Sequence, residues 1–187
     1  DGLQNISKTI PTEKKVEFIN RLSSIGLQEI EVTSFVSPQW VPQLSDAVDV
    51  SAAIQRNPLV RYTALVPNEI GLRKAIDSGY ESVAFFTTSS ETFSRRNTNC
   101  TISESLDTIT SLQNQWRENN VRVRVYISTV WYCPFEGKMD IEPLTEIIQK
   151  LFDINIDEIS LGDTIGKAKK SDVEETLEIL LKNWDPS

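Results

Sequence analysis

The chain has 187 residues, 39% hydrophobic and 25% charged, which is typical of one globular α/β domain with a sizeable core. Its 19 basic and 27 acidic residues give a net charge of −8. This balance argues against nucleic acid as the main partner, because phosphate neutralisation needs clustered lysine and arginine. No apolar run approaches the roughly 18 residues of a membrane span, so we expect no membrane partner. No charged and apolar leader precedes the first motif, so no signal peptide is predicted.

Short apolar runs alternate along the chain with longer amphipathic stretches. The runs are rich in β-branched and aromatic residues and are bounded by turn residues, which predicts strands, while the stretches between them predict helices. In chain order the expected elements are helix 13–25, strand 28–33, helix 46–55, strand 60–65, helix 69–77, strand 82–86, helix 103–119, strand 121–128, helix 141–152, strand 157–161 and helix 171–182. Thr12 and Ser171 can cap the first and last helices, and Asn68 after Pro67 opens the third.

Strand–helix–strand units that repeat at intervals of roughly 20–40 residues predict a parallel sheet. An open doubly wound sheet would bring a glycine-rich phosphate loop after its first strand, and segment 161–166 is too short to qualify. A closed (β/α)₈ barrel has eight units, and about six are counted here, the first without its strand. We therefore expect an α/β fold, a partial TIM barrel, as a single incomplete domain over 1–187 that lacks the first strand and the last two units.

The strand over 121–127 alternates valine and isoleucine with polar residues. Period two places Arg122, Arg124 and Tyr126 on one face, which points into the barrel if the valines pack under the helices. A buried guanidinium is costly unless it is paired. One interpretation is an edge strand with a solvated polar face. The other is that Arg124 binds an anion with Tyr126 above it, near the strand end where barrel sites lie.

Two further strands end in polar residues that are candidates for a site. The alternation of 29–33 places Glu31 and Thr33 on one face, and Glu31 is either the partner of an inward arginine or a solvated carboxylate. Gly162 permits a tight turn and the close approach of a ligand. Asp163 after it is either a helix-capping turn residue or a site carboxylate.

Two long loops are too specific in composition to be simple spacers. Loop 33–45 contains Phe35, Trp40 and two prolines, which suggests a stiff, partly buried lid or a hydrophobic cap on the barrel end. Loop 87–101 contains Arg95 and Arg96, which either grip phosphates or form a solvated pair.

The two cysteines, Cys100 and Cys133, cannot build a disulfide framework, and a reducing compartment is the simpler interpretation. Neither has a local base to activate it and the chain has no histidine, so both are expected to be structural.

Five motifs together resemble those of the 3-hydroxy-3-methylglutaryl-CoA lyase family, in order and at family-like spacing. They are segments 1–5, 31–43, 97–100, 133–138 and 160–166. The resemblance covers essentially the whole chain. It implies a TIM barrel enzyme that cleaves 3-hydroxy-3-methylglutaryl-CoA to acetyl-CoA and acetoacetate by metal-assisted retro-Claisen chemistry, in leucine degradation and ketone-body formation.

The resemblance also implies roles for individual residues. Asp1 would be a metal ligand, with a His-x-His pair and an asparagine expected beyond Ser187, and such coordination suits Mg²⁺ or Mn²⁺. The metal would chelate the substrate's 3-hydroxyl and lower its pKa. Asp163 would do acid/base work, and Glu31 would support a catalytic arginine expected just before Asp1. The substrate-pocket positions would be Arg124, Tyr126, Asn97, Ser160, Thr164 and Gln4.

The chain departs from the family at Ile6 and Ser7, where a glutamate and a lysine are common, with Lys8 one place on. CoA affinity or specificity is expected to differ if that lysine contributes. We expect the chain alone to be inactive, and the full-length protein to be a homodimer that acts on a small acyl-CoA. The expected location is cytoplasmic in a bacterium or the mitochondrial matrix in a eukaryote, with the cytoplasm favoured.

Two alternatives remain open at this point. One is a Claisen-condensing synthase that joins an acyl-CoA to a 2-oxo acid; such enzymes resemble a related opening motif with an acidic residue where Leu3 stands. The other is a non-catalytic partial barrel that binds CoA or assembles with a partner, for which exposed strand edges would be a liability.

Overall fold

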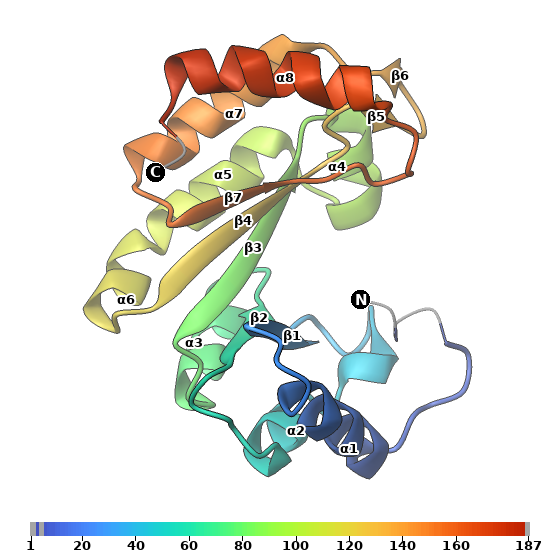
Figure 1. The fold of residues 1–187 in the computed structure, drawn as a ribbon, viewed down its shortest axis with the longest axis vertical. Helices are drawn as coiled ribbons and strands as arrows, with labels where there is room; N and C mark the ends of the chain where they lie inside the picture. The colour runs from blue at the N-terminus through green and yellow to red at the C-terminus, as the bar shows by residue number, and fades with distance from the viewer. Residues whose placement is uncertain (1–2, 4–5, 186–187) are drawn as a thin grey trace. The chain divides into compact units, whose positions relative to one another are not determined.

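A computed structural model describes residue 3 and residues 6–185 of the chain (Figure 1). Its main sheet has five strands in the order β1-β2-β3-β4-β7. These strands are β1 (Glu29–Ser34), β2 (Arg61–Leu65), β3 (Ser82–Thr88), β4 (Arg122–Ser128) and β7 (Glu158–Leu161). All five predicted strands are confirmed. Because neighbours in the sheet follow the chain order, the sheet has no reversal of the kind that defines a doubly wound fold.

The eight helices of the described residues are α1 (Thr12–Ser23), α2 (Ala47–Ala53), α3 (Glu69–Asp77), α4 (Glu91–Thr98), α5 (Ile102–Ser111), α6 (Gln113–Glu118), α7 (Ile141–Asp153) and α8 (Lys170–Asn183). A short 3₁₀ helix, η1 (Pro42–Leu44), and a hairpin of β5 (Tyr132–Cys133) and β6 (Gly137–Lys138) complete the list. The predicted helix 103–119 is in fact two helices that meet at Leu112. Helix α4 and the hairpin were not predicted, because neither has an extended apolar period.

Two of the predicted helix caps are wrong. Thr12 is already helical, and its hydroxyl donates to the Asp46 carboxylate at 2.8 Å. Ser171 is also inside its helix, and the Asp172 carboxylate accepts from the Lys169 N–H at 2.8 Å. The Asn68 cap is confirmed, because its side chain accepts from the Gly71 N–H at 3.0 Å.

Strands β1 and β2 pair in parallel, as do β2 and β3, with one irregularity in β1. Glu31 pairs with Thr63 and Ser34 with Leu65, so β1 holds one residue more than β2 across this interval. Because Thr63 and Leu65 share a face, Ser34 and not Thr33 lies on the face of Glu31. The prediction that Glu31 and Thr33 share a face is therefore wrong.

The chain divides into two compact units, residues 1–85 with 112–124 and residues 86–111 with 125–187, which are described separately. In the first unit α1 packs on α2 and β1, and the buried Phe35 ring meets Tyr80 edge-on at 6.0 Å. Trp40 of the same loop is 82% exposed, so only part of loop 33–45 caps the core. The single domain over 1–187 stays a prediction.

In the second unit α5 packs against α7, over a core that includes Val125, Ile127 and Leu144. Helices α7 and α8 meet where the rings of Phe152 and Trp184 stack at 6.0 Å.

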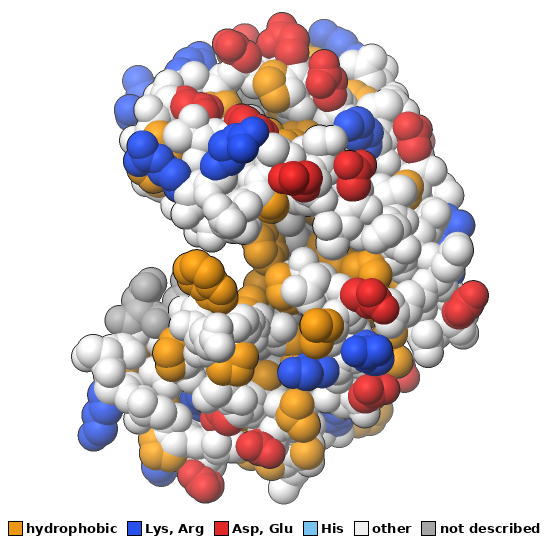
Figure 2. All heavy atoms as spheres, turned by 180° about the vertical axis from the view of Figure 1, so that it is seen from behind, with side chains coloured by type: hydrophobic (Ala, Val, Ile, Leu, Met, Phe, Trp, Pro, Cys, Tyr) orange, Lys and Arg blue, Asp and Glu red, His pale blue; other side chains and the backbone are white. Residues whose placement is uncertain are grey.

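On the face drawn in Figure 2, acidic and basic side chains are interspersed and no large basic patch forms there. Of the helices described, none has the length and apolar character needed to span a bilayer.

Gly162, just after β7, lies directly against the backbone of β4. Its N–H donates to the Ile127 carbonyl at 2.8 Å, and an added Cβ would stand 3.1 Å from the same oxygen. The glycine therefore allows the backbone of β4 to approach closely, whereas the sequence predicted the close approach of a ligand.

Replacing this glycine tests the contact. We expect Gly162→Ala to lower the free energy of unfolding of the full-length protein by about 1–2 kcal/mol, because the new methyl group must push β7 away from β4. Urea denaturation measures this change. The control Ile165→Ala alters an exposed residue of the same loop and should shift stability by less than about 0.5 kcal/mol. Equal effects of the two substitutions would contradict the close-contact explanation.

Candidate active site

The first unit contains a cluster of charges centred on Glu29, at the start of β1. The Arg124 guanidinium binds the Glu29 carboxylate through two nitrogens, Nη1 to Oε1 at 2.9 Å and Nη2 to Oε2 at 3.0 Å. Arg61 Nη1 lies 3.2 Å from Glu29 Oε2, and the Thr63 hydroxyl donates to Oε1 at 3.0 Å. Only 17% of Arg124 and 19% of Glu29 are exposed, so each charge compensates for the desolvation of the other.

The sequence pointed to Glu31 as the natural partner of an inward arginine, whereas the bidentate pair of Arg124 is with Glu29. Period two places both glutamates on one face, so the alternation that identified Glu31 could also have identified Glu29. Glu31 itself is exposed. Arg124 as an anion-binding residue and Glu31 as a supporting residue stay predictions.

In the second unit Asp163 closes the turn that follows β7. Its two carboxylate oxygens accept the backbone N–H groups of Lys167, at 3.1 Å, and of Ala168, at 2.8 Å. Its carbonyl accepts from Gly166, whose φ of 63° is the left-handed conformation that glycine permits. Asp163 is therefore a turn residue, but it does not cap α8, whose N-cap is Lys169. Because a carboxylate has about four acceptor positions, Asp163 can still receive a ligand proton, and its acid/base role stays a prediction.

Buried hydroxyl groups, which no sequence motif indicates, join the ends of β3 and β4. The Thr88 and Thr129 hydroxyls lie 2.6 Å apart, and the Ser89 hydroxyl donates to the Thr129 carbonyl at 2.7 Å. The Thr129 N–H donates to the Thr164 hydroxyl at 2.7 Å. The network therefore contacts one candidate site residue, the exposed Thr164, which precedes Ile165 and follows Asp163 in the chain.

The β5–β6 hairpin is fastened to helix α4. Ser90, the N-cap of α4, lies 3.1 Å from the buried Cys133 sulfur, and the Glu136 carboxylate accepts from the Thr92 N–H at 2.9 Å. The Phe135 ring lies 6.3 Å from the Phe93 ring and 4.3 Å from the Arg96 guanidinium carbon.

These contacts explain two of the sequence motifs. Cys133 is a buried packing residue, which agrees with the expected structural role. Arg96 stacks on an aromatic ring and Arg95 forms an exposed pair with Glu91 at 3.1 Å, so both cations of loop 87–101 have partners within this unit. Asn97 follows at the exposed end of α4, and its role in substrate binding stays a prediction.

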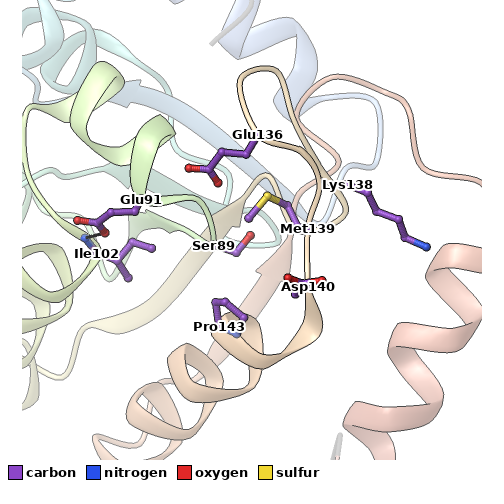
Figure 3. Close-up of a pocket in the computed structure, with 8 residues that line it drawn as sticks. All are labelled: Ser89, Glu91, Ile102, Glu136, Lys138, Met139, Asp140 and Pro143. Atoms are coloured by element: carbon purple, nitrogen blue, oxygen red, sulfur yellow. Dashed lines mark hydrogen bonds between the residues drawn. The ribbon is translucent and has the colours of Figure 1, made fainter.

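A cavity of about 390 Å³ lies between α4, the hairpin and the start of α7 (Figure 3). Its lining includes the carboxylates of Glu91, Glu136 and Asp140, while the Lys138 side chain points away from it. Glu91 and Glu136 already accept backbone N–H groups, from Ile102 and Thr92. An acidic lining repels phosphate groups, so this cavity does not suit the phosphates of an acyl-CoA.

The predicted site residues are distributed over both units. Glu31 and Arg124 belong to the first, whereas Tyr126, Asn97, Ser160, Asp163 and Thr164 belong to the second. Tyr126 and Ser160 are half-buried on β4 and β7. Asp1 and Gln4 lie outside the described residues. Convergence of these side chains on a single pocket therefore stays a prediction.

The side chains that the structure describes do not form a metal site. Among them no group of three or more histidine, cysteine, aspartate or glutamate residues could hold a metal ion. The described part of the chain thus does not supply a ligand set.

The Glu29 cluster gives the first prediction for this site. Glu29→Gln should lower the free energy of unfolding of the full-length protein by about 2–3 kcal/mol, because it removes the charge that both terminal nitrogens of the half-buried Arg124 contact. Chemical denaturation measures the loss. Glu17→Gln removes a carboxylate that pairs with Lys14 and Arg21 on the exposed face of α1, and no measurable change is expected there. A wild-type stability for Glu29→Gln would show that the pair contributes nothing.

The tie between the hairpin and α4 gives a pH-dependent prediction. Burial acts to raise the pKa of Glu136, but hydrogen bonds from Thr92 and Ser90 outweigh it and hold the pKa below its ordinary value of 4.5. A lowered folded-state pKa stabilises the fold above the unfolded value, and this contribution is lost as the pH falls through the folded value.

The stability difference between wild type and Glu136→Gln should therefore be present at pH 7, on the order of 0.5 kcal/mol after screening by water, and should diminish as the pH falls below 4.5. Urea unfolding at several pH values measures it. Glu178→Gln, on the exposed side of α8, is the control and should stay close to wild type throughout. A difference that grows on acidification would contradict the assignment.

Comparisons with known proteins place this geometry in a family. The HMGL-like family model matches residues 1–186. The chain is 46% identical over 184 residues to the hydroxymethylglutaryl-CoA lyase YngG of Bacillus subtilis, covering 98% of this chain and 62% of that protein. Other relatives of similar identity are named as cytoplasmic and mitochondrial lyases of vertebrates.

Solved structures agree with this match. The crystal structure of the Bacillus subtilis HMG-CoA lyase superposes with a TM-score of 0.96 at 45% identity, over 99% of this chain and 62% of that one. An HMG-CoA lyase from Acinetobacter baumannii, in complex with coenzyme A and 3-methylmalate, gives a TM-score of 0.94 at 30% identity, over 100% of this chain and 61% of that one.

The chain thus spans 62% of the length of its bacterial relative and 54% of that of a rat cytoplasmic lyase. The expected partial TIM barrel is confirmed by its five-stranded sheet and these structural neighbours. The recognition of the lyase family from five sequence motifs is also confirmed, and the chain belongs to the HMGL-like family.

Proposed function

We propose that the full-length protein cleaves 3-hydroxy-3-methylglutaryl-CoA to acetyl-CoA and acetoacetate. The observation that carries this proposal is the match of the whole chain, in sequence and in backbone, to a hydroxymethylglutaryl-CoA lyase at 45% identity and a TM-score of 0.96. The neighbour that holds coenzyme A and 3-methylmalate supports an acyl-CoA with a branched, oxygen-rich acyl group as the ligand.

The reaction needs a base, a cleavable carbon–carbon bond and an acid. The base takes the proton of the 3-hydroxyl. The electron pair of this O–H bond forms the C=O bond of the acetoacetate ketone. The C2–C3 bond breaks, and its electron pair forms the enolate of acetyl-CoA. A proton delivered to C2 completes the products.

We assign the acid/base work at the substrate to Asp163, on the exposed turn after β7. Thr164 beside it, with Ser160, Tyr126 and Asn97, would contact substrate from the second unit. Arg124 would attract the acyl carboxylate, Glu31 would orient a neighbouring cation, and Gln4 would bind substrate. Because Glu29 already holds the Arg124 guanidinium in place, a substrate carboxylate would meet a cation of fixed orientation.

We further infer a divalent cation, Mg²⁺ or Mn²⁺, with Asp1 as one ligand and the remaining ligands outside the present sequence. A homodimer in the cytoplasm is the arrangement we expect of the full-length protein. The relatives include lyases named as cytoplasmic and as mitochondrial, so the cytoplasmic location is an inference that fractionation of the source cells would check.

The competing proposal is a synthase that runs the same bond chemistry forward. The 35–43 segment and Leu3 favour cleavage over condensation, and the lyase names of the relatives support that direction. The two functions differ in substrate, so a pair of assays separates them.

The test uses the full-length purified protein with hydroxymethylglutaryl-CoA, and acetoacetate is measured as product. In parallel, acetyl-CoA with 2-oxo acids is assayed for condensation. Cleavage that is lost on treatment with a chelator and restored by Mg²⁺ or Mn²⁺ is the expected result. Condensation without cleavage would overturn the proposal.

Asp163 is tested in the same assay. Asp163→Asn should lower kcat by at least about 100-fold, because it removes a proton-transferring group while one side-chain oxygen can still close the turn. The matched control is Asp153→Asn, which alters an exposed carboxylate at the end of α7 and should leave kcat unchanged. An active Asp163→Asn protein would exclude Asp163 as the acid or base.

A further inference from the structure

Thr129 is the unusual residue of the second unit. Four non-glycine residues of the described chain have a positive φ, and three of them are asparagines, which tolerate the left-handed conformation. The fourth is Thr129, with a φ of 55°. It is β-branched and fully buried, and a β-branched side chain in this conformation is strained.

Hydroxyl bonds hold Thr129 in this conformation. Its Oγ1 lies 2.6 Å from the Thr88 hydroxyl at the end of β3 and donates to the Ser128 carbonyl at 2.7 Å. The Ser89 hydroxyl donates to its carbonyl at 2.7 Å. Thr88, Ser89 and Thr129 are buried, so relaxation of the Thr129 backbone would break hydrogen bonds that are shielded from water.

The backbone at Thr129 also forms hydrogen bonds with the turn after β7. The Thr129 N–H donates to the Thr164 hydroxyl at 2.7 Å, and the next N–H, of Val130, donates to the Gly162 carbonyl at 3.2 Å. The Gly162 N–H in turn donates to the Ile127 carbonyl at 2.8 Å. Three hydrogen bonds therefore join the turn that carries Asp163 to the end of β4, two donated by the N–H groups of Thr129 and Val130 and one donated by that of Gly162.

The bond to Thr164 has a direction that matters chemically. Once the Thr129 N–H occupies a lone pair of this hydroxyl, the hydroxyl proton is available for donation. Thr164 is exposed, and no other described residue accepts from it. A ligand oxygen, such as a carboxylate or hydroxyl oxygen of an acyl group, is the acceptor that this geometry fits.

We propose that Thr129 is a positioning residue: its left-handed backbone turns the Thr164 hydroxyl toward an oxygen of the substrate's acyl group. This inference rests on the proposed lyase function. Thr129 touches no substrate itself, and its effect should be seen in substrate affinity and not in the rate of bond cleavage.

Two substitutions in the full-length protein separate conformation from hydroxyl chemistry. Thr129→Val and Thr129→Gly remove the same hydroxyl, but only valine keeps the β-branch that disfavours a positive φ. Without its hydroxyl bonds the valine backbone should relax and carry the N–H away from Thr164. We expect Thr129→Val to raise KM for hydroxymethylglutaryl-CoA at least about tenfold, with kcat within about threefold of wild type.

Thr129→Gly should keep KM within about threefold of wild type, because glycine adopts this conformation without strain, and Thr129→Ser should behave as wild type. The matched control is Asn155→Gly, at another left-handed position (φ 50°) just past the end of α7. It should change neither KM nor kcat. Thermal unfolding of every variant shows which proteins are folded.

A second variant decides the matter if Thr129→Val does not fold. Thr88→Val removes the β3 hydroxyl with a side chain suited to a strand. Because Thr88 acts through the conformation of Thr129, its substitution should raise KM in the wild-type background and have no effect on KM in the Thr129→Gly background.

Equal KM values for Thr129→Val and Thr129→Gly, or a Thr88→Val effect that is the same in both backgrounds, would overturn the inference while leaving the lyase function intact. A wild-type protein that does not cleave hydroxymethylglutaryl-CoA would remove the proposed function and this inference with it. The two failures are therefore distinguishable.

Discussion

The close approach of Gly162 to the Ile127 carbonyl is the contact on which the second unit's candidate site depends. It allows the backbone of β7 to reach β4 without a side chain between them. The residues after Gly162 form a turn that the Asp163 carboxylate closes. The backbone N–H groups of Thr129 and Val130 donate hydrogen bonds to this turn. A rigid turn at the end of a strand is how barrel enzymes hold reactive groups, because the strands fix the backbone and the turn aims the side chain.

In the first unit the main feature is a pair of largely buried charges, Arg124 and Glu29. The Glu29 carboxylate forms ion pairs with Arg124 and Arg61 and accepts a hydrogen bond from the Thr63 hydroxyl. Such a cluster adds little net stability compared with an apolar core, but it fixes the direction of the guanidinium. The carboxylate that offsets the desolvation of the Arg124 guanidinium therefore also fixes its orientation.

The sequence predicts the elements that have a clear pattern of apolar residues. It does not predict features that depend on local backbone geometry. Short runs of β-branched and aromatic residues predict all five strands, and Asn68 after Pro67 predicts where α3 begins. Helix α4 was missed because one phenylalanine among eight residues leaves no amphipathic period, and the hairpin because two-residue strands have no pattern. Glu29 was passed over although its face was predicted. Thr129 carries no signal, because a positive φ in a threonine is imposed by its neighbours and is not encoded in its type.

The irregular pairing in β1 changes how a sequence of this kind has to be read. Up to Glu31 the odd-numbered positions share a face, and beyond Val32 that face passes to the even-numbered ones. The strand therefore contains a change of phase, and a motif that spans it cannot be sorted into inward and outward side chains by counting alone. A related chain that lacks the additional residue would have to carry its polar side chains at the opposite parity to present the same surface.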